Sequence, residues 1–158
     1  MAEIIVITSG KGGVGKTTTT ANVGVGLSML GKRVAVIDTD LGLRNLDLAL
    51  GLENLVVYDI TDAVAGDCRV REALVKDSKY GALAFLPASQ FKDKSSLTPD
   101  QLKEVVEELK EKYEYILIDC PAGIEQGFTN AVAAAQKAVV VVNPEPYSLR
   151  DADRIAGL

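Results

Sequence analysis

A glycine-rich segment near the start of the chain carries the residue types that bind phosphate groups. Residues 10–17 read GKGGVGKT, which satisfies the pattern G-x-x-x-x-G-K-[ST]. Glycines let backbone N–H groups turn inward and form an anion-binding nest at the start of a helix. We therefore expect a binding site for the phosphates of ATP or ADP, made by Gly10, Lys11, Gly12, Gly13, Val14, Gly15, Lys16, Thr17 and Thr18.

Three side chains of this segment have chemistry suited to a nucleotide. The ammonium of Lys16 suits the β- and γ-phosphates, the hydroxyl of Thr17 suits Mg²⁺, and Thr18 adds a donor near the α-phosphate. A tight turn without function is the alternative. It does not explain why the segment lies between a predicted strand and a predicted helix, as the phosphate-binding mechanism requires.

Carboxylates follow two other predicted strands. Asp119 ends the run YILID, and Asp38 and Asp40 follow RVAVI. Ligands bind at the carboxyl edge of open α/β sheets, so these groups are candidates to hold Mg²⁺ and its waters and to orient an attacking water. Helix capping is the alternative for each of the three.

Short apolar runs alternate with helical stretches along the whole chain, which predicts an α/β protein with right-handed crossovers and a mainly parallel sheet. We expect one domain over residues 1–158. The predicted strands are 3–8, 33–38, 82–86, 115–119 and 138–142. The predicted helices are 16–30, where apolar Val23, Leu27 and Leu30 recur at helical spacing, the short pieces 60–65 and 70–75, and a helix capped by Thr98.

Composition excludes several classes of function. The formal net charge of -5 disfavours generic binding to nucleic acid or an anionic membrane, and the absence of histidine removes the commonest catalytic base. Cys68 and Cys120 have neither zinc-site spacing nor the density of a disulfide scaffold. No apolar run reaches the roughly 18 residues that span a bilayer, and no signal peptide is evident, so a cytoplasmic protein is expected.

Four longer motifs resemble the deviant Walker A ATPases of the ParA/MinD family. They are KGGVGKTTTTANVG with its extra Lys11, IDTDLGLRNLDLALGLEN from Ile37, IDCPAGIEQG from Ile118, and the final NPEPYSLRDADRIAGL. The first motif is shared across the family, whereas GLRNLD, DCPAGIE and RDADR are more specific to its MinD branch. The resemblance covers essentially the whole chain, and it implies a three-layer P-loop NTPase fold with helices on both sheet faces.

The resemblance assigns roles by position. Lys11 would cross an ATP-dependent homodimer to contact the nucleotide of the other subunit, which makes Lys11, Lys16 and Asp40 the expected catalytic residues. Asp40 would position the water, and Thr17, Asp38 and Asp119 would serve the Mg²⁺ shell. Pro121 and Gly123 would form the second switch, which senses the γ-phosphate.

In the MinD branch, ATP-bound dimers bind membrane through a C-terminal amphipathic helix, recruit the division inhibitor MinC, and are released when MinE stimulates hydrolysis. The partner surface here resembles a helix starting near Ser148, with Ala152, Ile155 and Ala156 packed inward; a solvated helix face is the alternative. Its exposed partner-binding residues would be Arg150, Asp151, Asp153 and Arg154.

This sequence also departs from the branch. Pro146 and Tyr147 replace the small or branched residues expected in the partner-facing segment, and the chain is shorter than the family's members. The missing part would supply further strands, much of the adenine pocket and the membrane-binding helix. A full-length member is therefore expected at the inner membrane as a peripheral protein.

The leading expectation is an Mg²⁺-dependent ATP hydrolase that regulates the placement of the division septum. A nucleotide-binding module with little turnover and a ParA-like partitioning ATPase are the alternatives, although the acidic balance and GLRNLD speak against DNA partitioning. An iron–sulfur reductase would need cluster cysteines at a symmetric interface, for which Cys120 is poorly placed beside Asp119.

Overall fold

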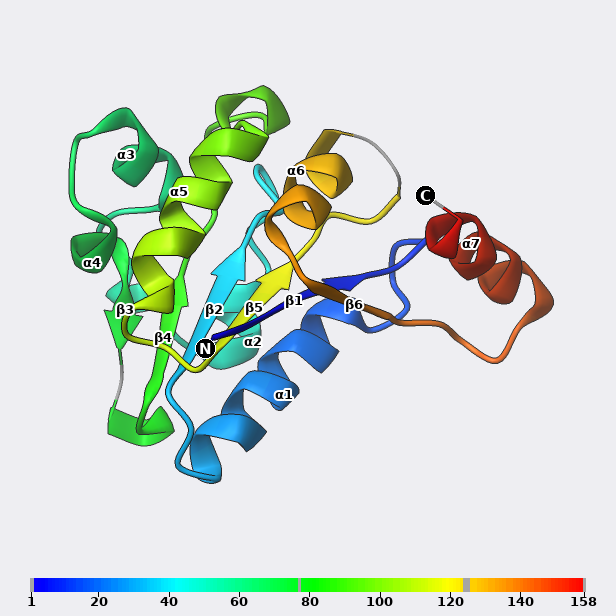
Figure 1. The fold of residues 1–158 in the computed structure, drawn as a ribbon, viewed down its shortest axis with the longest axis horizontal. Coiled ribbons are helices and arrows are strands. Elements are labelled where there is room, and N and C mark those ends of the chain that lie inside the picture. Colours follow the sequence, from blue (N-terminus) through cyan, green and yellow to red (C-terminus); the bar gives the residue numbers. More distant parts are fainter. Residues whose placement is uncertain (1, 77, 124–125, 158) are drawn as a thin grey trace.

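One six-stranded sheet organises the protein in a computed structural model that describes residues 2–76, 78–123 and 126–157. The strand order is β3-β4-β2-β5-β1-β6; β3 runs antiparallel to β4, and the other neighbours are parallel (Figure 1). The strands are β1 (Glu3–Thr8), β2 (Val34–Asp38), β3 (Val75–Lys76), β4 (Leu83–Leu86), β5 (Tyr115–Asp119) and β6 (Lys137–Val140).

The described part of the chain contains seven α-helices and three single 3₁₀ turns, and all of them except α7 lie between strands in the sequence. The helices are α1 (Lys16–Met29), α2 (Leu46–Leu50), α3 (Ile60–Ala65), α4 (Val70–Ala73), α5 (Pro99–Lys110), α6 (Gln126–Ala134) and α7 (Pro146–Ala156). The 3₁₀ turns are Glu53–Leu55, Ser78–Tyr80 and Lys94–Ser96.

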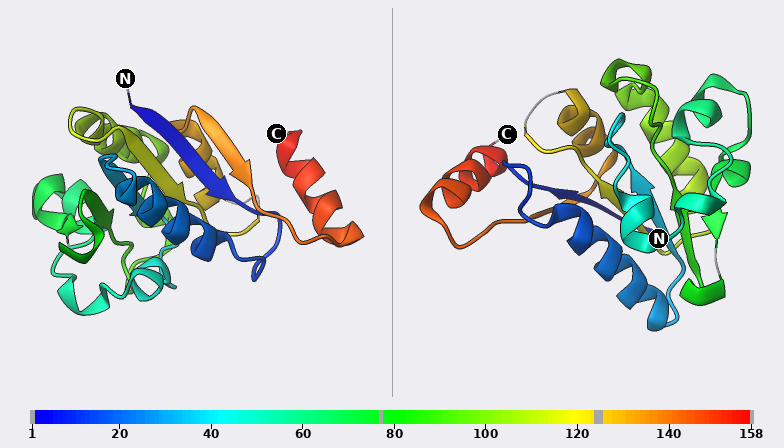
Figure 2. Two further views of the ribbon diagram at one scale, coloured as in Figure 1. Left: turned by 90° about the horizontal axis from the view of Figure 1, so that it is seen from below. Right: turned by 180° about the vertical axis from the view of Figure 1, so that it is seen from behind.

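Helices cover both faces of the sheet, as Figure 2 shows from two further directions. Buried side chains of α3, α4, α5 and α6 pack on one face, and those of α1 and α2 pack on the other, so the central strands β2, β4 and β5 are buried on both sides, whereas the edge strand β6 is largely exposed. This arrangement confirms the predicted three-layer α/β fold with a mainly parallel sheet.

Helix α5 forms where its local signals predict it. The Thr98 hydroxyl accepts a hydrogen bond from the Gln101 N–H at 3.3 Å, and the Gln101 side chain accepts one from the Thr98 N–H at 2.9 Å. Pro99 occupies the first turn, where its missing N–H has no intrahelical partner to lose. These capping contacts and the buried stripe of Leu102, Val105, Val106 and Leu109 are determined by residues close together in sequence.

Three predicted boundaries are wrong, two because of tertiary pairing and one because of a local preference. The helix expected over 70–75 ends at Ala73, because Val75 and Lys76 pair with β4 as the short strand β3. The strand expected over 138–142 is Lys137–Val140, since its register follows β1. The last helix begins at Pro146 rather than near Ser148, because proline is favoured in a first turn.

The sheet places the functional region at its carboxyl edge. Strands β1, β2 and β5 are neighbours and parallel, so the loops that follow Thr8, Asp38 and Asp119 meet there. In Figure 1 the loop after β1 leads into α1 on one side of the sheet, and α7 lies beyond it.

Candidate functional site

The loop between β1 and α1 has the backbone shape of an anion cradle. Gly13 and Gly15 have φ of 77° and 95°, a left-handed conformation that glycine adopts without strain. An added Cβ at Gly12, Gly13 or Gly15 would meet nothing within 4 Å, so the loop borders open space. Gly15 caps α1 without any side-chain hydrogen bond, which leaves the positive end of the helix to attract an anion.

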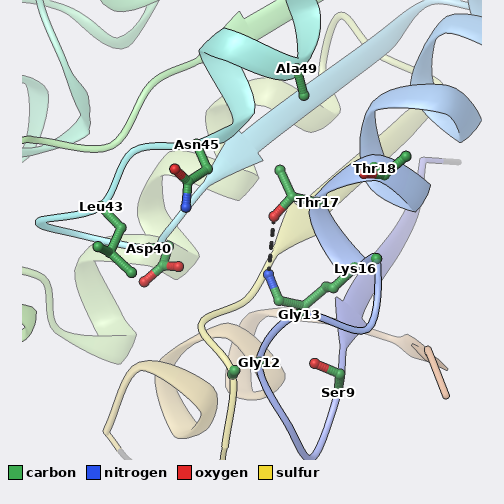
Figure 3. A pocket seen from close by; sticks show the side chains of 12 residues that line it. Ser9, Gly12, Gly13, Lys16, Thr17, Thr18, Asp40, Leu43, Asn45 and Ala49 are labelled. Carbon is green, nitrogen blue, oxygen red and sulfur yellow. Dashed lines mark hydrogen bonds between the residues drawn. The ribbon is translucent and has the colours of Figure 1, made fainter. Parts of the chain in front are cut away.

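A cavity of about 480 Å³ lies against this loop, within the size range typical of ligand pockets. Figure 3 shows the side chains that line it, with Thr17 and Lys16 on the side of α1 and Asp40 and Asn45 from the segment after β2. The lining residues are Ser9, Gly12, Gly13, Gly15, Lys16, Thr17, Thr18, Asp40, Leu43, Asn45, Ala49 and Ala122.

The Lys16 side chain links the phosphate loop to the end of β5. Its Nζ lies 2.9 Å from Asp119 Oδ1 and 3.5 Å from Thr17 Oγ1, and the Lys16 and Asp119 side chains are only 8% and 1% exposed. Thr20 Oγ1 also donates to Asp119 Oδ1 at 3.0 Å. The predicted phosphate-binding lysine therefore rests on the predicted metal-site carboxylate, in an ion pair removed from water.

Asp38 lies beside Asp119, because the two residues are register partners in β2 and β5. Burial first, and then the negative charge of Asp119, raises the pKa of Asp38 from 3.8 to about 7. Two backbone donors oppose this shift: the N–H groups of Asp40 and Leu46 donate to Asp38 at 2.9 and 3.2 Å. Asp38 thus positions both the chain after β2 and the start of α2.

The donor set fits a Mg²⁺ ion shared with phosphate and water better than an all-protein metal cage. Among the described residues, no three acidic or cysteine side chains gather closely enough to enclose a cation. Mg²⁺ keeps much of its water shell and is usually held by one or two carboxylates together with substrate phosphates. The Thr17 hydroxyl at the cradle and the paired Asp38 and Asp119 behind it match that chemistry.

The remaining predicted residues of the loop and second switch take different places. Lys11 is exposed and does not line the cavity, although its carbonyl accepts a hydrogen bond from Ser9 Oγ at 2.8 Å. Gly10 and Val14 also lie outside the lining. Gly123 has φ of 91°, and its N–H donates to the Ser9 carbonyl at 3.2 Å.

The buried ring of Pro121 packs on Gly127, where an added Cβ would lie 2.7 Å from Pro121 Cγ. Residues 124–125 of the IDCPAGIEQG motif, and Leu158 of the final motif, lie outside the described residues.

Helix α7 packs directly on the phosphate loop. A Cβ at Gly10 would lie 2.4 Å from Asp151 Cβ, so the first glycine of the motif allows the helix to approach. Arg150, Asp153 and Arg154 are exposed as predicted, whereas Asp151 is only 31% exposed and lies 3.7 Å from Arg154. Ile155 is buried, but Ala156, which the sequence placed inward, is exposed.

Sequence reasoning missed Asn45. This residue lines the cavity, makes no capping hydrogen bond to α2, and its carboxamide lies near Asp40 and Thr17 in Figure 3. Its position depends on the turn before it, in which Arg44 has φ of 43°, rare for a residue with a side chain. The only signal in the sequence is its place seven residues after Asp38, within the motif that carries the resemblance.

None of the helices in the described part of the chain is long and apolar enough to cross a membrane.

Comparison with known proteins places the chain in a family. A sequence model of the AAA domain family matches residues 2–157. The septum site-determining protein MinD of Bacillus subtilis is 58% identical over 159 aligned residues, which cover 100% of this chain and 59% of the relative. The MinD protein of Synechocystis is 57% identical, with the same shares covered.

Solved structures agree in fold. In the MinC:MinD cell division complex of Aquifex aeolicus, the matched chain is 54% identical with a TM-score of 0.89, covering 99% of this chain and 62% of that one. MinD of Pyrococcus horikoshii complexed with Mg-ADP is 39% identical with a TM-score of 0.87, covering 100% and 67%. This chain therefore spans about three fifths of the length of its curated relatives, and it belongs to the AAA domain family and, within it, to the MinD branch of deviant Walker A ATPases.

Proposed function

We propose that residues 1–158 form one Mg²⁺-dependent ATP-binding domain whose hydrolysis of ATP is coupled to dimerisation. The observation that carries this proposal is the cradle itself, in which Gly13 and Gly15 take left-handed conformations beside Lys16 and Thr17 at a helix start that has no side-chain cap. A nest of this geometry suits a polyanion. The relative from Pyrococcus horikoshii complexed with Mg-ADP supports the same ligand class.

The residues divide the work of phosphoryl transfer by position. Backbone amides of residues 12–17 and the Lys16 ammonium would hold the β- and γ-phosphates, so that phosphate oxygens compete with Asp119 for the lysine. Asp40, which lines the cavity, would orient a water for attack on the γ-phosphorus, whose bond to the bridging oxygen then breaks to release ADP. Mg²⁺, held through Thr17, Asp38 and Asp119, would neutralise charge on those phosphates.

Lys11 is suited to a nucleotide on a second copy of the chain. It belongs to the phosphate loop, but its side chain is exposed and does not line the cavity of its own chain. A loop lysine in that position can reach across a face-to-face homodimer, and hydrolysis then depends on assembly. Gly123, tied to Ser9 at the start of the loop, would relay the presence of the γ-phosphate to the segment after β5.

The cellular role that we propose is the placement of the division septum, as the names of the MinD relatives state for those proteins. The exposed Arg150, Asp153 and Arg154 of α7 would contribute to the surface for MinC, which the Aquifex aeolicus structure contains in complex with MinD, and for MinE. Because Asp151 packs on Gly10, this surface adjoins the nucleotide site.

A binding module with little turnover is the second candidate. The observation that favours it is the 59% share of the curated relatives that this chain spans, since residues of the remaining length can complete the nucleotide site in those proteins. Such a module would bind ADP and ATP tightly and release phosphate no faster than a disabled variant.

Phosphate release from Mg-ATP, measured together with nucleotide affinity and particle size, tests the proposal. The unchanged chain should bind ADP, form dimers with ATP, and turn over faster than Asp40→Asn and Lys11→Ala. Lys11→Ala should keep nucleotide affinity, because that side chain is outside its own cavity. Binding without turnover selects the second candidate, and the absence of ADP binding contradicts both.

A further inference from the structure

A second cavity lies at the opposite edge of the sheet from the phosphate loop. It measures about 210 Å³ and is lined by Arg33, Lys76, Lys112, Tyr113 and residues 81–83; we call it the amino-edge pocket. Arg33 directly precedes β2, residue 82 precedes β4, and Tyr113 precedes β5, so the pocket sits where these parallel strands begin. Figure 1 shows these strand starts on the far side of the sheet from the loop that follows β1.

Strand pairing and the crossover connections bring Arg33, Lys76 and Lys112 together at this edge of the sheet. Strand β3 runs antiparallel to β4, with Lys76 opposite Ala84, which brings the end of β3 to the start of β4. Lys112 arrives from the end of α5, and Arg33 from the end of the α1 crossover. At about 3.3 Å per residue, the four or five residues of each strand separate this pocket from the nucleotide cavity by roughly 15 Å.

The charge in this region is largely unpaired. Within the described part of the chain, neither Lys76 nor Lys112 forms an ion pair, and both are exposed. Among the described residues, the Arg33 guanidinium pairs with Glu114 alone, at 3.5 Å between side chains that are 60% and 38% exposed, and an exposed pair of this kind has little strength in water. In a chain of net charge -5, three cations converge on one hollow, and none of the described residues in its lining is acidic.

An adjoining hollow of about 50 Å³ extends the basic surface. It shares Lys76, Lys112 and Tyr113 with the amino-edge pocket and adds Arg71 and Glu108. Among the described residues that line the two hollows, four side chains are cationic and one is a carboxylate. Arg71 also forms no ion pair with any described residue.

The volume of the amino-edge pocket and the arrangement of its cations suit a small anion. The volume lies below the roughly 300 Å³ at which pockets for drug-sized ligands begin, so it suits a single phosphate or pyrophosphate group. A carboxylate is planar and is matched by one arginine fork, whereas a phosphate directs oxygens several ways and can meet cations from three separate elements. We propose that the amino-edge pocket binds a phosphate group of a small ligand, independently of the nucleotide site.

A titration of the ¹⁵N-labelled chain with inorganic pyrophosphate, followed by NMR, tests the proposal by location. Amide signals of Ala82, Leu83 and Tyr113 should shift with a saturable dependence, and the affinity should fall as sodium chloride is raised. Signals of Gly13 and Lys16 report binding at the phosphate loop in the same spectra. Because each site has its own amide signals, binding at the amino-edge pocket and binding at the phosphate loop are observed separately. A failure of this proposal is therefore distinct from a failure of the proposed function.

Inorganic phosphate and AMP serve as further probes. Shifts at the amino-edge pocket with phosphate alone indicate a free anion as the ligand, and shifts with AMP indicate that a phosphate carried by a larger molecule is also accepted. If a glutamate-rich peptide shifts Ala82, Leu83 and Tyr113 while none of the phosphate probes does, the pocket is a protein contact and the proposal is overturned.

Two charge-removing variants and one matched control complete the test. Lys76→Ala and Lys112→Ala should each weaken pyrophosphate binding at the pocket by about tenfold, the loss of one charged contact. Lys103→Ala removes the same charge from an exposed position on α5 that does not line the pocket, and it should bind as the unchanged chain does. Equal affinity in all three variants, or no shifts at Ala82, Leu83 and Tyr113 with pyrophosphate, would overturn the proposal.

Discussion

Replacing Lys16 with alanine should destabilise the protein as well as disable phosphate binding. The Lys16 ammonium lies 2.9 Å from Asp119 Oδ1, in surroundings where the two side chains are 8% and 1% exposed. Removal of the lysine leaves Asp119 buried with the Thr20 hydroxyl as its remaining side-chain donor, and with the Asp38 carboxyl close by. A buried charge without a counterion is unfavourable.

The magnitude follows from measurements on other buried ion pairs. Breaking such a pair from one side typically lowers the free energy of unfolding by about 3–5 kcal/mol, against a total of about 5–15 kcal/mol for a domain. Each kcal/mol shifts the melting temperature of a chain of this size by about 2–4 °C, so Lys16→Ala should melt roughly 10 °C below the unchanged protein.

Thermal unfolding followed by circular dichroism, without nucleotide or Mg²⁺, measures this effect. The matched control is Lys11→Ala, which removes the same charge from the same loop at an exposed position and should melt within about 1 °C of the unchanged chain. Lys16→Ala/Asp119→Asn should recover part of the loss, because asparagine leaves no uncompensated charge and still accepts a hydrogen bond from Thr20.

The reasoning is refuted if Lys16→Ala and Lys11→Ala melt at the same temperature, or if the double variant is no more stable than Lys16→Ala. Either result would mean that the ion pair between Lys16 and Asp119 contributes little to folding. Lys16→Ala would then lower ATP hydrolysis without lowering stability. The structure instead indicates that Lys11→Ala is the variant that leaves stability unchanged.

Three further measurements probe the core and its ionisable groups. Gly24→Ala should lower the free energy of unfolding by about 1–3 kcal/mol in a urea titration, because its Cβ would lie 2.8 Å from a buried valine methyl. Gly26→Ala, with nothing within 4 Å, should raise it by up to about 1 kcal/mol; the same sign for both contradicts the packing. Folding raises the pKa of Asp38 from 3.8 to about 7, so between these pH values the folded chain retains a proton that the unfolded chain has released. The free energy of unfolding, measured relative to that of Asp38→Asn, should therefore fall as the pH rises from about 4 to 7. A difference between the two proteins that stays constant over this range would argue against the raised pKa. Cys120 is fully buried, and burial raises its pKa to about 12. Ellman's reagent should therefore label Cys68 alone until urea is added. Two fast-reacting thiols in the native chain would show that Cys120 is accessible.

The sequence alone determined the features that depend on neighbouring residues. The glycine-rich turn between a strand and a helix, the strands 3–8 and 115–119, and the capping of α5 were all predicted at the positions where they occur. Glycine spacing, capping residues and short apolar runs act over a few residues of chain, so their consequences can be read without knowledge of the fold. The carboxyl-edge placement of Asp38 and Asp119 also followed, because parallel strands end at one edge.

Only the tertiary structure decided which surfaces these elements use. Helix α1 buries Ala21 and Gly24 rather than its larger apolar residues, and Val23 and Leu30 are 40% and 77% exposed, because the helix packs closely on the sheet. The contact between Lys16 and Asp119 joins residues 103 positions apart. Such contacts depend on strand order and helix approach, which hydrophobic periodicity does not encode, and that is why the ion pair and the amino-edge pocket could not be predicted from the sequence.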